Sequence, residues 1–253
     1  MRAIPTDEIW LTDSLYFNLN YYGGHRYLDN CGEFMVRAQE QLGFVAKEAR
    51  PTGATMNQPE TAATIELNSG SLSMSFPCFE LDWDYFKTTS NEVAKIADEL
   101  VNPVGVDSRG CCANLYRKVQ SEQDAYDLSL KIGGLGEWKP MADALGLSFL
   151  QQSRMMSFVS GSYDLRVEIK PVAFSVPNKR TSNYGFRPTD KRREIVDKSN
   201  ELALKERALH GAGYAVLLEI DLIEQTPDRL DFSSQVDALK KHVAVVTQLG
   251  IFS

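Results

Sequence analysis

The sequence is poor in the residues that make catalytic and metal sites easy to recognise. It has three histidines and four cysteines in 253 residues. The cysteines form no C-x-x-C pair and have no histidine at zinc-ligand spacing, so a structural zinc site is not expected. The G-x-S-x-G turn that carries the nucleophile of many hydrolases is also absent. The sequence therefore predicts no catalytic residue and no resident metal or cofactor.

Long apolar segments are missing as well. No run approaches the roughly 18–20 apolar residues that a membrane-spanning helix needs, and the first residues, MRAIPTDEIW, lack the apolar core of a secretory signal. We therefore expect a cytoplasmic protein with no membrane partner and with reduced thiols. Cys111 and Cys112 are adjacent, so they should point to opposite faces of a strand. Redox sensing by this pair is the alternative to a purely structural role.

Charge is unevenly distributed along the chain. The 27 basic and 34 acidic side chains give a formal net charge of −7. This charge argues against a protein that coats nucleic acid through a generally basic surface. Residues 177–193 nevertheless hold six basic side chains and one acid, with aromatic residues between them. Such a segment can bind phosphates or stack on bases, or it can be a solvated loop. The predicted partner-binding residues are Lys179, Arg180, Tyr184, Arg187, Lys191, Arg192 and Arg193.

The alternation of apolar residues predicts the elements of the first half. Leu15, Phe17 and Leu19 share one face of a strand over 15–22, and spacings of three and four predict a helix over 28–42. The other elements expected here are a strand over 44–48, a loop over 50–60, a hairpin over 63–83 that turns at Ser69-Gly70, and a helix that begins at a capping box of Thr89 and Glu92 and ends at Asn102-Pro103.

The second half shows the same mixture of strands and helices. The expected elements are a strand over 109–119, a helix over 122–132 capped by Ser121, a hairpin over 155–176, a charged helix over 189–209, a strand over 214–223 and a final helix capped by Ser234. The strand over 214–223 is apolar on both faces, so we expect it in the interior of a sheet.

Interleaved helices and hairpins predict an α+β fold, with mainly antiparallel sheets packed by amphipathic helices. A hairpin followed by a helix occurs at 63–101 and again at 154–209, so a diverged internal duplication is one interpretation. The predicted division is an N-terminal half over 1–105 and a C-terminal half over 106–253, and one continuous domain is the alternative.

Carboxylates that alternate along a strand are the candidates for chemistry. Asp82 and Asp84 share one face of the predicted hairpin, and Glu219 and Asp221 share one face of the predicted interior strand. Carboxylates arranged in this way can bind Mg²⁺ for phosphoryl transfer. Two other interpretations are a solvated strand face and, for Glu219 or Asp221, an ion pair with a basic residue on a neighbouring strand.

Three stretches, TIELNSGSLSMSF, YAVLLEIDLIEQ and DFSSQVDALKKHVAVVTQLGIF, resemble in order and spacing an uncharacterised, sporadically distributed bacterial family of about this length. In that family a strand-turn-strand lies in the first half, and an acidic strand precedes a C-terminal helix. Such scattered families often belong to mobile or defence-associated gene sets. The resemblance carries no catalytic residue over to this chain.

Two hypotheses about function follow. The first is a non-enzymatic binding protein, a subunit or a recognition or inhibitor module of a bacterial defence-type or toxin-antitoxin-type complex, with another protein as the first candidate partner and nucleic acid as the alternative through 178–193. The second is a metal-dependent enzyme that acts on nucleic acid or nucleotides and uses carboxylates among Asp82, Asp84, Glu219 and Asp221.

Overall fold

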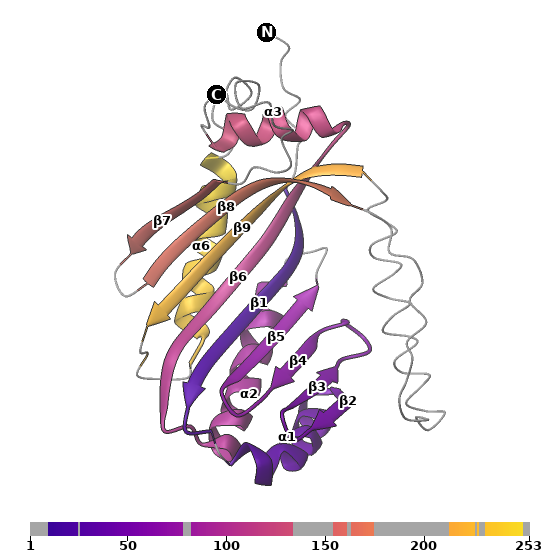
Figure 1. The fold of residues 1–253 in the computed structure, drawn as a ribbon, viewed down its shortest axis with the longest axis vertical. Coiled ribbons are helices and arrows are strands. Elements are labelled where there is room, and N and C mark those ends of the chain that lie inside the picture. Colours follow the sequence, from indigo (N-terminus) through magenta and orange to yellow (C-terminus); the bar gives the residue numbers. More distant parts are fainter. Residues whose placement is uncertain are drawn as a thin grey trace, which may run out of the picture.

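The structure is a computed structural model. It describes residues 10–24, 26–77, 82–133, 154–160, 163–174, 213–225, 227 and 231–249. Its described strands form one nine-stranded antiparallel sheet in the order β2-β3-β4-β5-β1-β6-β9-β8-β7 (Figure 1). The predicted α+β class, with an antiparallel sheet, is therefore confirmed.

The bounds of the elements are as follows. The strands are β1 (Leu11–Tyr22), β2 (Val45–Arg50), β3 (Gly53–Asn57), β4 (Thr64–Leu67), β5 (Ser71–Pro77), β6 (Gly105–Val119), β7 (Arg154–Ser160), β8 (Tyr163–Phe174) and β9 (Gly213–Gln225). The described helices are α1 (Tyr27–Leu42), α2 (Trp83–Val101), α3 (Glu122–Gly133) and α6 (Ser233–Leu249).

The described elements follow one path twice. From β1 the chain forms α1, then β2 to β5, and β5 returns to pair with β1 before α2 begins. From β6 the chain forms α3, then β7, β8 and β9, and β9 returns to pair with β6 before α6 begins. The two first strands, β1 and β6, pair with each other antiparallel, so the sheet continues without a break across the predicted boundary at 105/106.

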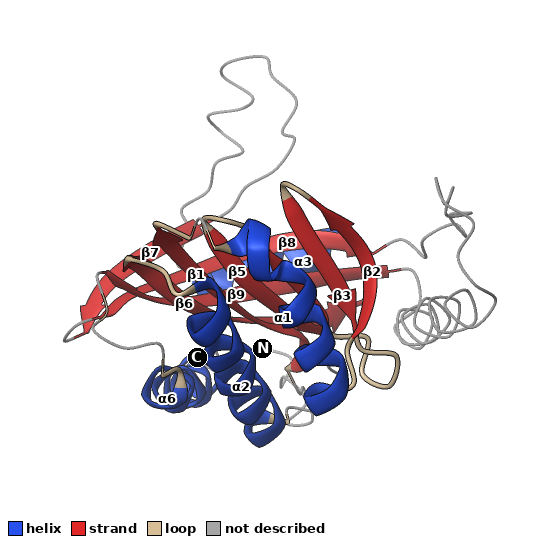
Figure 2. Ribbon diagram, turned by 90° about the horizontal axis from the view of Figure 1, so that it is seen from below, coloured by secondary structure: helices blue, strands red, loops and turns tan. Residues whose placement is uncertain are grey.

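Helices α1, α2 and α6 lie on one face of the sheet (Figure 2), and α3 packs against β6, β8 and β9. Alternate residues of each strand point toward these helices, because successive side chains of a strand point to opposite faces. In β1 they are Leu15, Phe17, Leu19 and Tyr21, which are all buried, as the period-two pattern predicts. We call the face opposite α1, α2 and α6 the open face.

Strand β9 occupies the interior position that its composition predicts, between β6 and β8. Ile220 and Leu222 are fully buried on the helix side. Gln235 of α6 is also fully buried, and its side-chain amide donates hydrogen bonds to the carbonyl oxygens of Arg109 and Leu222, at 3.1 and 2.8 Å. One side chain thus fixes α6 against the two central strands β6 and β9.

Three predictions of local structure are wrong. Residues 53–57 form β3 instead of a loop, because this short strand pairs with β2 on one side and β4 on the other. The hairpin does not continue to 83, since α2 begins at Trp83. The capping box at Thr89 and Glu92 does not start that helix either. The cap is Asp82, whose carboxylate accepts a hydrogen bond from the Tyr85 amide at 2.9 Å.

The start of the final helix also differs from the prediction. Ser234 lies inside the first turn of α6, and the amide of Ser233 donates to the Asp231 carboxylate at 2.8 Å. By contrast, the start of α3 is capped as predicted, and α1 ends at a glycine. Gly43 ends α1 in the left-handed conformation, with φ +73°, and Ser121 accepts from the Asp124 amide at 3.1 Å at the start of α3.

The helix predicted over 189–209 lies outside the described residues, so the structure does not test that prediction. In the part of the chain that the structure describes, no helix is both long and apolar enough to cross a membrane.

Candidate functional site

The open face is lined by polar side chains along its centre. The register brings Ser73 of β5 beside Asn18 of β1, and Tyr16 of β1 beside Cys112 of β6. Further polar residues that share this face are Ser14, Asn20, Ser71, Ser75, Ser108 and Asn114. A sheet that packs on helices with one face normally shows such groups on the other. This pattern alone therefore does not mark a site.

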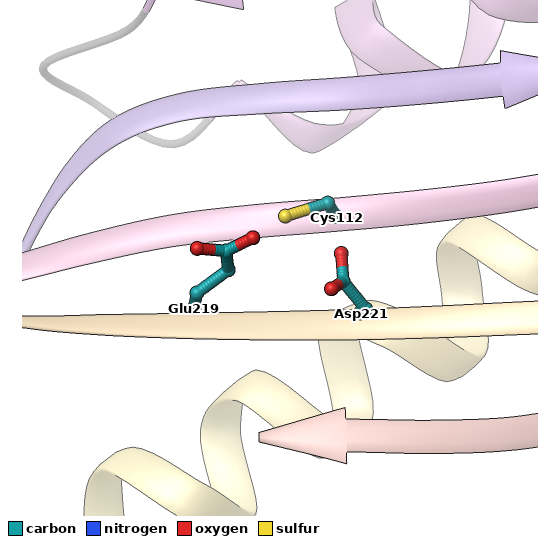
Figure 3. A group of neighbouring side chains, drawn as sticks. All are labelled: Cys112, Glu219 and Asp221. Carbon is teal, nitrogen blue, oxygen red and sulfur yellow. The ribbon is translucent and has the colours of Figure 1, made fainter. Parts of the chain in front are cut away.

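A cluster of three ionisable side chains distinguishes the middle of the open face. Cys112 lies opposite Asp221 in the pairing of β6 with β9, and Glu219 is two residues before Asp221 on the same face. The ligand-type atoms of these three residues all lie within 4.8 Å of one another. In Figure 3 the three side chains point into the same space between the two strands.

The neighbouring strand β8 adds a third carboxylate and a cation. Glu168 lies directly opposite Glu219, a pairing of like charges that is unfavourable by itself. The ammonium group of Lys170 lies 3.2 Å from both carboxylates and compensates part of this repulsion. The predicted pairing of Glu219 with a basic residue on a neighbouring strand is thereby confirmed. We call Glu168, Glu219, Asp221 and Lys170 the acidic centre.

The acidic centre holds three carboxylates and one ammonium group. Asp221 takes part in no ion pair among the described residues, although Arg166 lies opposite it in the register and is exposed. Glu219 and Asp221 are both half-buried, so water screens their charges less than it would on a fully exposed surface. The centre therefore carries an excess of negative charge that a cation or a basic group could neutralise.

The Cys112 thiol beside these carboxylates is held in its neutral form. It is 5% exposed, and burial raises its pKa well above the usual value, with the neighbouring Asp221 carboxylate raising it further. The sulfur also lies 3.6 Å from the Asn114 side-chain oxygen, to which it donates. Cys111 points to the opposite face, as predicted, and burial raises its pKa too. Since thiolates are the reactive form, these conditions disfavour redox sensing by the pair.

Tyr16 forms the border of the cluster on the β1 side. It lies opposite Cys112 and is 36% exposed. Partial burial raises the pKa of its phenol, and the nearby Cys112, Glu66 and Asp221 raise it as well, against a hydrogen bond with Ser73 that lowers it. The phenol is therefore neutral at ordinary pH and available to donate or accept a hydrogen bond.

The structure brings only half of the predicted carboxylates together. Glu219 and Asp221 belong to the cluster. Asp82 instead caps α2, and Asp84 is exposed in the first turn of that helix. Because α2 lies on the helix-covered side of the sheet (Figure 2), these two do not join Glu219 and Asp221 on the open face. The predicted partner-binding segment 178–193 lies outside the described residues.

Sequence reasoning missed three members of the site, namely Cys112, Glu168 and Lys170. A signal existed for Cys112, since its neighbour Cys111 belongs to an apolar face and Cys112 must then point the other way. Nothing in the sequence pairs β6 or β8 with β9, however, and only that pairing places these residues beside Glu219.

The chemistry of the cluster allows two kinds of ligand. Carboxylate oxygens accept hydrogen bonds from a guanidinium or ammonium group, and an arginine fork fits them best. A thiolate with carboxylates can also bind a transition metal such as Zn²⁺, provided the thiol loses its proton on binding. Comparison of the chain with protein-family models and with curated proteins found no match in either case.

Proposed function

We propose that this chain is a non-enzymatic binding protein whose open face receives a basic group of a partner protein at the acidic centre. The observation that carries this proposal is the excess of carboxylates there: Glu168 and Glu219 share Lys170, and Asp221 has no ion pair among the described residues. A partner's arginine would supply the missing cation and could bond Asp221 with both of its terminal nitrogens.

The surroundings of the acidic centre favour a protein partner. Serine and asparagine side chains from β1, β5 and β6 offer donors and acceptors across the same face. Such groups form the hydrogen bonds typical of a polar protein interface. A phosphate backbone would instead meet carboxylates of its own sign on this face. The open face therefore supports a protein partner, while nucleic acid remains the alternative for the segment 178–193.

The biological setting comes from the resemblance described above. It implies a subunit, or a recognition or inhibitor module, of a bacterial defence-type or toxin-antitoxin-type complex. We also infer that the two halves arose by a diverged duplication. The support for this is the repeated path, in which β1 and β6 each start a half, pair with that half's last strand, and pair with each other. The identity of the genes that adjoin this one tests whether the protein belongs to such a complex.

A labelled hexa-arginine peptide tests the recognition step. Binding measured by fluorescence anisotropy should weaken with added salt, and it should weaken about fivefold in E219Q/D221N, which removes two ion pairs of about 0.5 kcal/mol each. The matched control is E40Q/D98N, which removes the same charge from exposed positions on α1 and α2. Equal binding by wild type and E219Q/D221N, or equal loss in both variants, would contradict the proposal.

A metal-dependent enzyme is the second candidate, and the specific observation behind it is the sulfur of Cys112 among the carboxylates. A specific ion at 100 times its dissociation constant should stabilise the protein by about 2.7 kcal/mol. Thermal melts with Zn²⁺, Mn²⁺ or Mg²⁺ measure this stabilisation. An increase that disappears in C112S and in E219Q/D221N would favour this candidate, and hydrolysis of a nucleic acid or nucleotide would then be assayed. No shift with any ion would leave the binding protein as the better proposal.

A further inference from the structure

The two edge strands of the sheet differ in the side chains that they expose. At one edge, β2 carries Lys47, Glu48 and Arg50, and its pairing with β3 is interrupted by an irregularity between Ala46 and Glu48. Charges and bulges are the usual devices that keep an edge from pairing with another chain. The β2 edge is therefore protected.

The other edge has no such irregularity, and its one charged residue, Arg154, is the first residue of the strand. Strand β7 pairs with β8 in unbroken register over all seven of its residues. Its exposed side chains are largely apolar: Met155 is 62%, Phe158 50% and Val159 82% exposed. The main contacts of α6 are with β6, β9 and α2, and Ser234 of α6 also lies 3.4 Å from the Tyr163 hydroxyl of β8; none of these contacts involves β7. A regular apolar edge of this kind is a template for pairing with a further strand.

The sequence of β7 is complementary to itself in the antiparallel direction. Consider two copies related by a twofold axis through Ser157. Met155 of one copy then lies opposite Val159 of the other, and Met156 lies opposite Phe158. The first pair lies on the open face and the second on the helix-covered face, because residues of a strand alternate between faces. Every apolar side chain of the strand thus meets an apolar side chain of the second copy.

The charges of β8 fit the same arrangement. Glu168, Arg166 and Asp164 lie opposite Met155, Ser157 and Val159 in the pairing of β8 with β7. In the twofold pair they would border the apolar contacts of the open face on both sides. An apolar centre with a polar border is the usual organisation of a specific interface.

We propose that β7 is the self-association surface of this protein, and that two copies pair antiparallel through β7, centred on Ser157, to form one continuous sheet. The occupant of the edge is a second copy, since no other strand has to be invoked to satisfy both faces of β7. The acidic centre remains accessible in this arrangement, because its residues lie on the open face of β8 and β9 and none of them belongs to β7.

Sedimentation velocity of the full chain at rising concentration tests the association, and a pair of charge variants tests the register. M155K/V159K places lysines opposite each other at both open-face contacts, so the dimer should dissociate. M155K/V159E places a lysine opposite a glutamate at both, so the dimer should persist and become sensitive to salt. V36K, at an exposed position of α1, is the control and should associate like wild type.

Disulfide trapping supplies a second readout. In S157C the introduced thiols face each other across the twofold axis, where opposed α-carbons about 4.5–5.5 Å apart are within disulfide range. Mild oxidation should therefore yield a covalent dimer, whereas A49C, on the exposed β2 edge, should yield none beyond the parent background.

A wild type that stays monomeric at every concentration would overturn the proposal. So would a K/E variant that dissociates as fully as the K/K variant, because that result excludes the register centred on Ser157. Circular dichroism melts establish whether each variant is folded. A double variant that is not folded is replaced by the single substitutions V159K and V159E. Each of these should weaken the dimer less than M155K/V159K.

Discussion

The two faces of the central strands β1, β6 and β9 use the same backbone for different purposes. Toward the helices, Leu15, Phe17 and Ile220 are completely buried. Toward the open side, their sequence neighbours are Tyr16, Asn18 and Asp221, which keep contact with water. Most of the apolar burial of these strands is therefore on one face, and the charges on the other face contribute little to folding. Substitutions at adjacent positions can measure this difference directly.

The largest contrast is expected between Phe17 and Tyr16. Phe17 is fully buried, and its ring centre lies 4.7 Å from that of Phe232, the residue that precedes α6. F17A should lower the free energy of unfolding by about 4 kcal/mol, because it removes buried surface and leaves a cavity. Y16A, one residue away on the open face, should cost no more than about 1 kcal/mol. Urea unfolding measures both, and equal losses would mean that the open face is not open in solution.

Substitution of a charged residue should likewise cost more stability on the helix-covered face than on the open face. Arg109 is only 6% exposed on the helix side, lies 2.5 Å from the Glu224 carboxylate, also donates to the Asp231 carbonyl, and stacks near Phe232. E224Q should cost about 3 kcal/mol, since it removes one partner of a buried ion pair.

The open-face counterpart is E219Q, which leaves Lys170 still paired with Glu168. It should change stability by no more than about 0.5 kcal/mol. Urea unfolding of both variants at one ionic strength tests the contrast. A cost in E219Q as large as that in E224Q would show that the acidic centre is part of the folding core.

The apolar alternation was sufficient to predict which face is buried. The pattern of β1 and the apolar run of β9 depend only on neighbours in the chain, and both strands lie where that pattern requires. The predictions that failed depend instead on pairing between strands, which the local sequence does not determine. Strand β3 has the short sequence GATMN, which has little pattern of its own and is ordered by pairing with β2 and β4. Such tertiary pairing overrides local preference.

The start of α2 illustrates the same limit. Phe79, Leu81 and Trp83 alternate as a strand would, yet Trp83 and Phe86 are buried from the first turn of a helix. At the candidate site, the sequence identified Glu219 and Asp221 as sharing a face, which is a local property. It could not identify Cys112 or Lys170 as their neighbours, because those contacts depend on the order of strands in the sheet.

Alkaline pH should weaken the fold through buried thiols and phenols that lie on both faces of the sheet. Burial raises the pKa of both Cys111 and Cys112 and raises the pKa of Tyr27 and Tyr116 to about 12. A group whose pKa is higher in the folded state stabilises the fold fully below its unfolded pKa, and this contribution is lost as pH rises. Since the thiol reference value is 9.0, the melting temperature should fall above about pH 9. The double variant C111A/C112A should show a shallower fall, and an unchanged slope would contradict this account.

The smallest effect on stability is expected in the segment that the sequence marks as basic. We predict that Arg187, Arg192 and Arg193 contact an anionic partner, either a protein surface or a phosphate backbone. R187A/R192A/R193A should then leave the urea midpoint nearly unchanged, because exposed charges contribute little to folding. Binding to a labelled single-stranded oligonucleotide, or to a poly-glutamate peptide, should weaken, and the wild-type affinity should fall with salt as counterions are released. The comparison with E219Q/D221N separates the two charged regions, since that variant should weaken binding of the arginine peptide only. A triple variant that unfolds, or one that binds both anionic probes as well as wild type at low salt, would show that the basic segment is not an external binding surface.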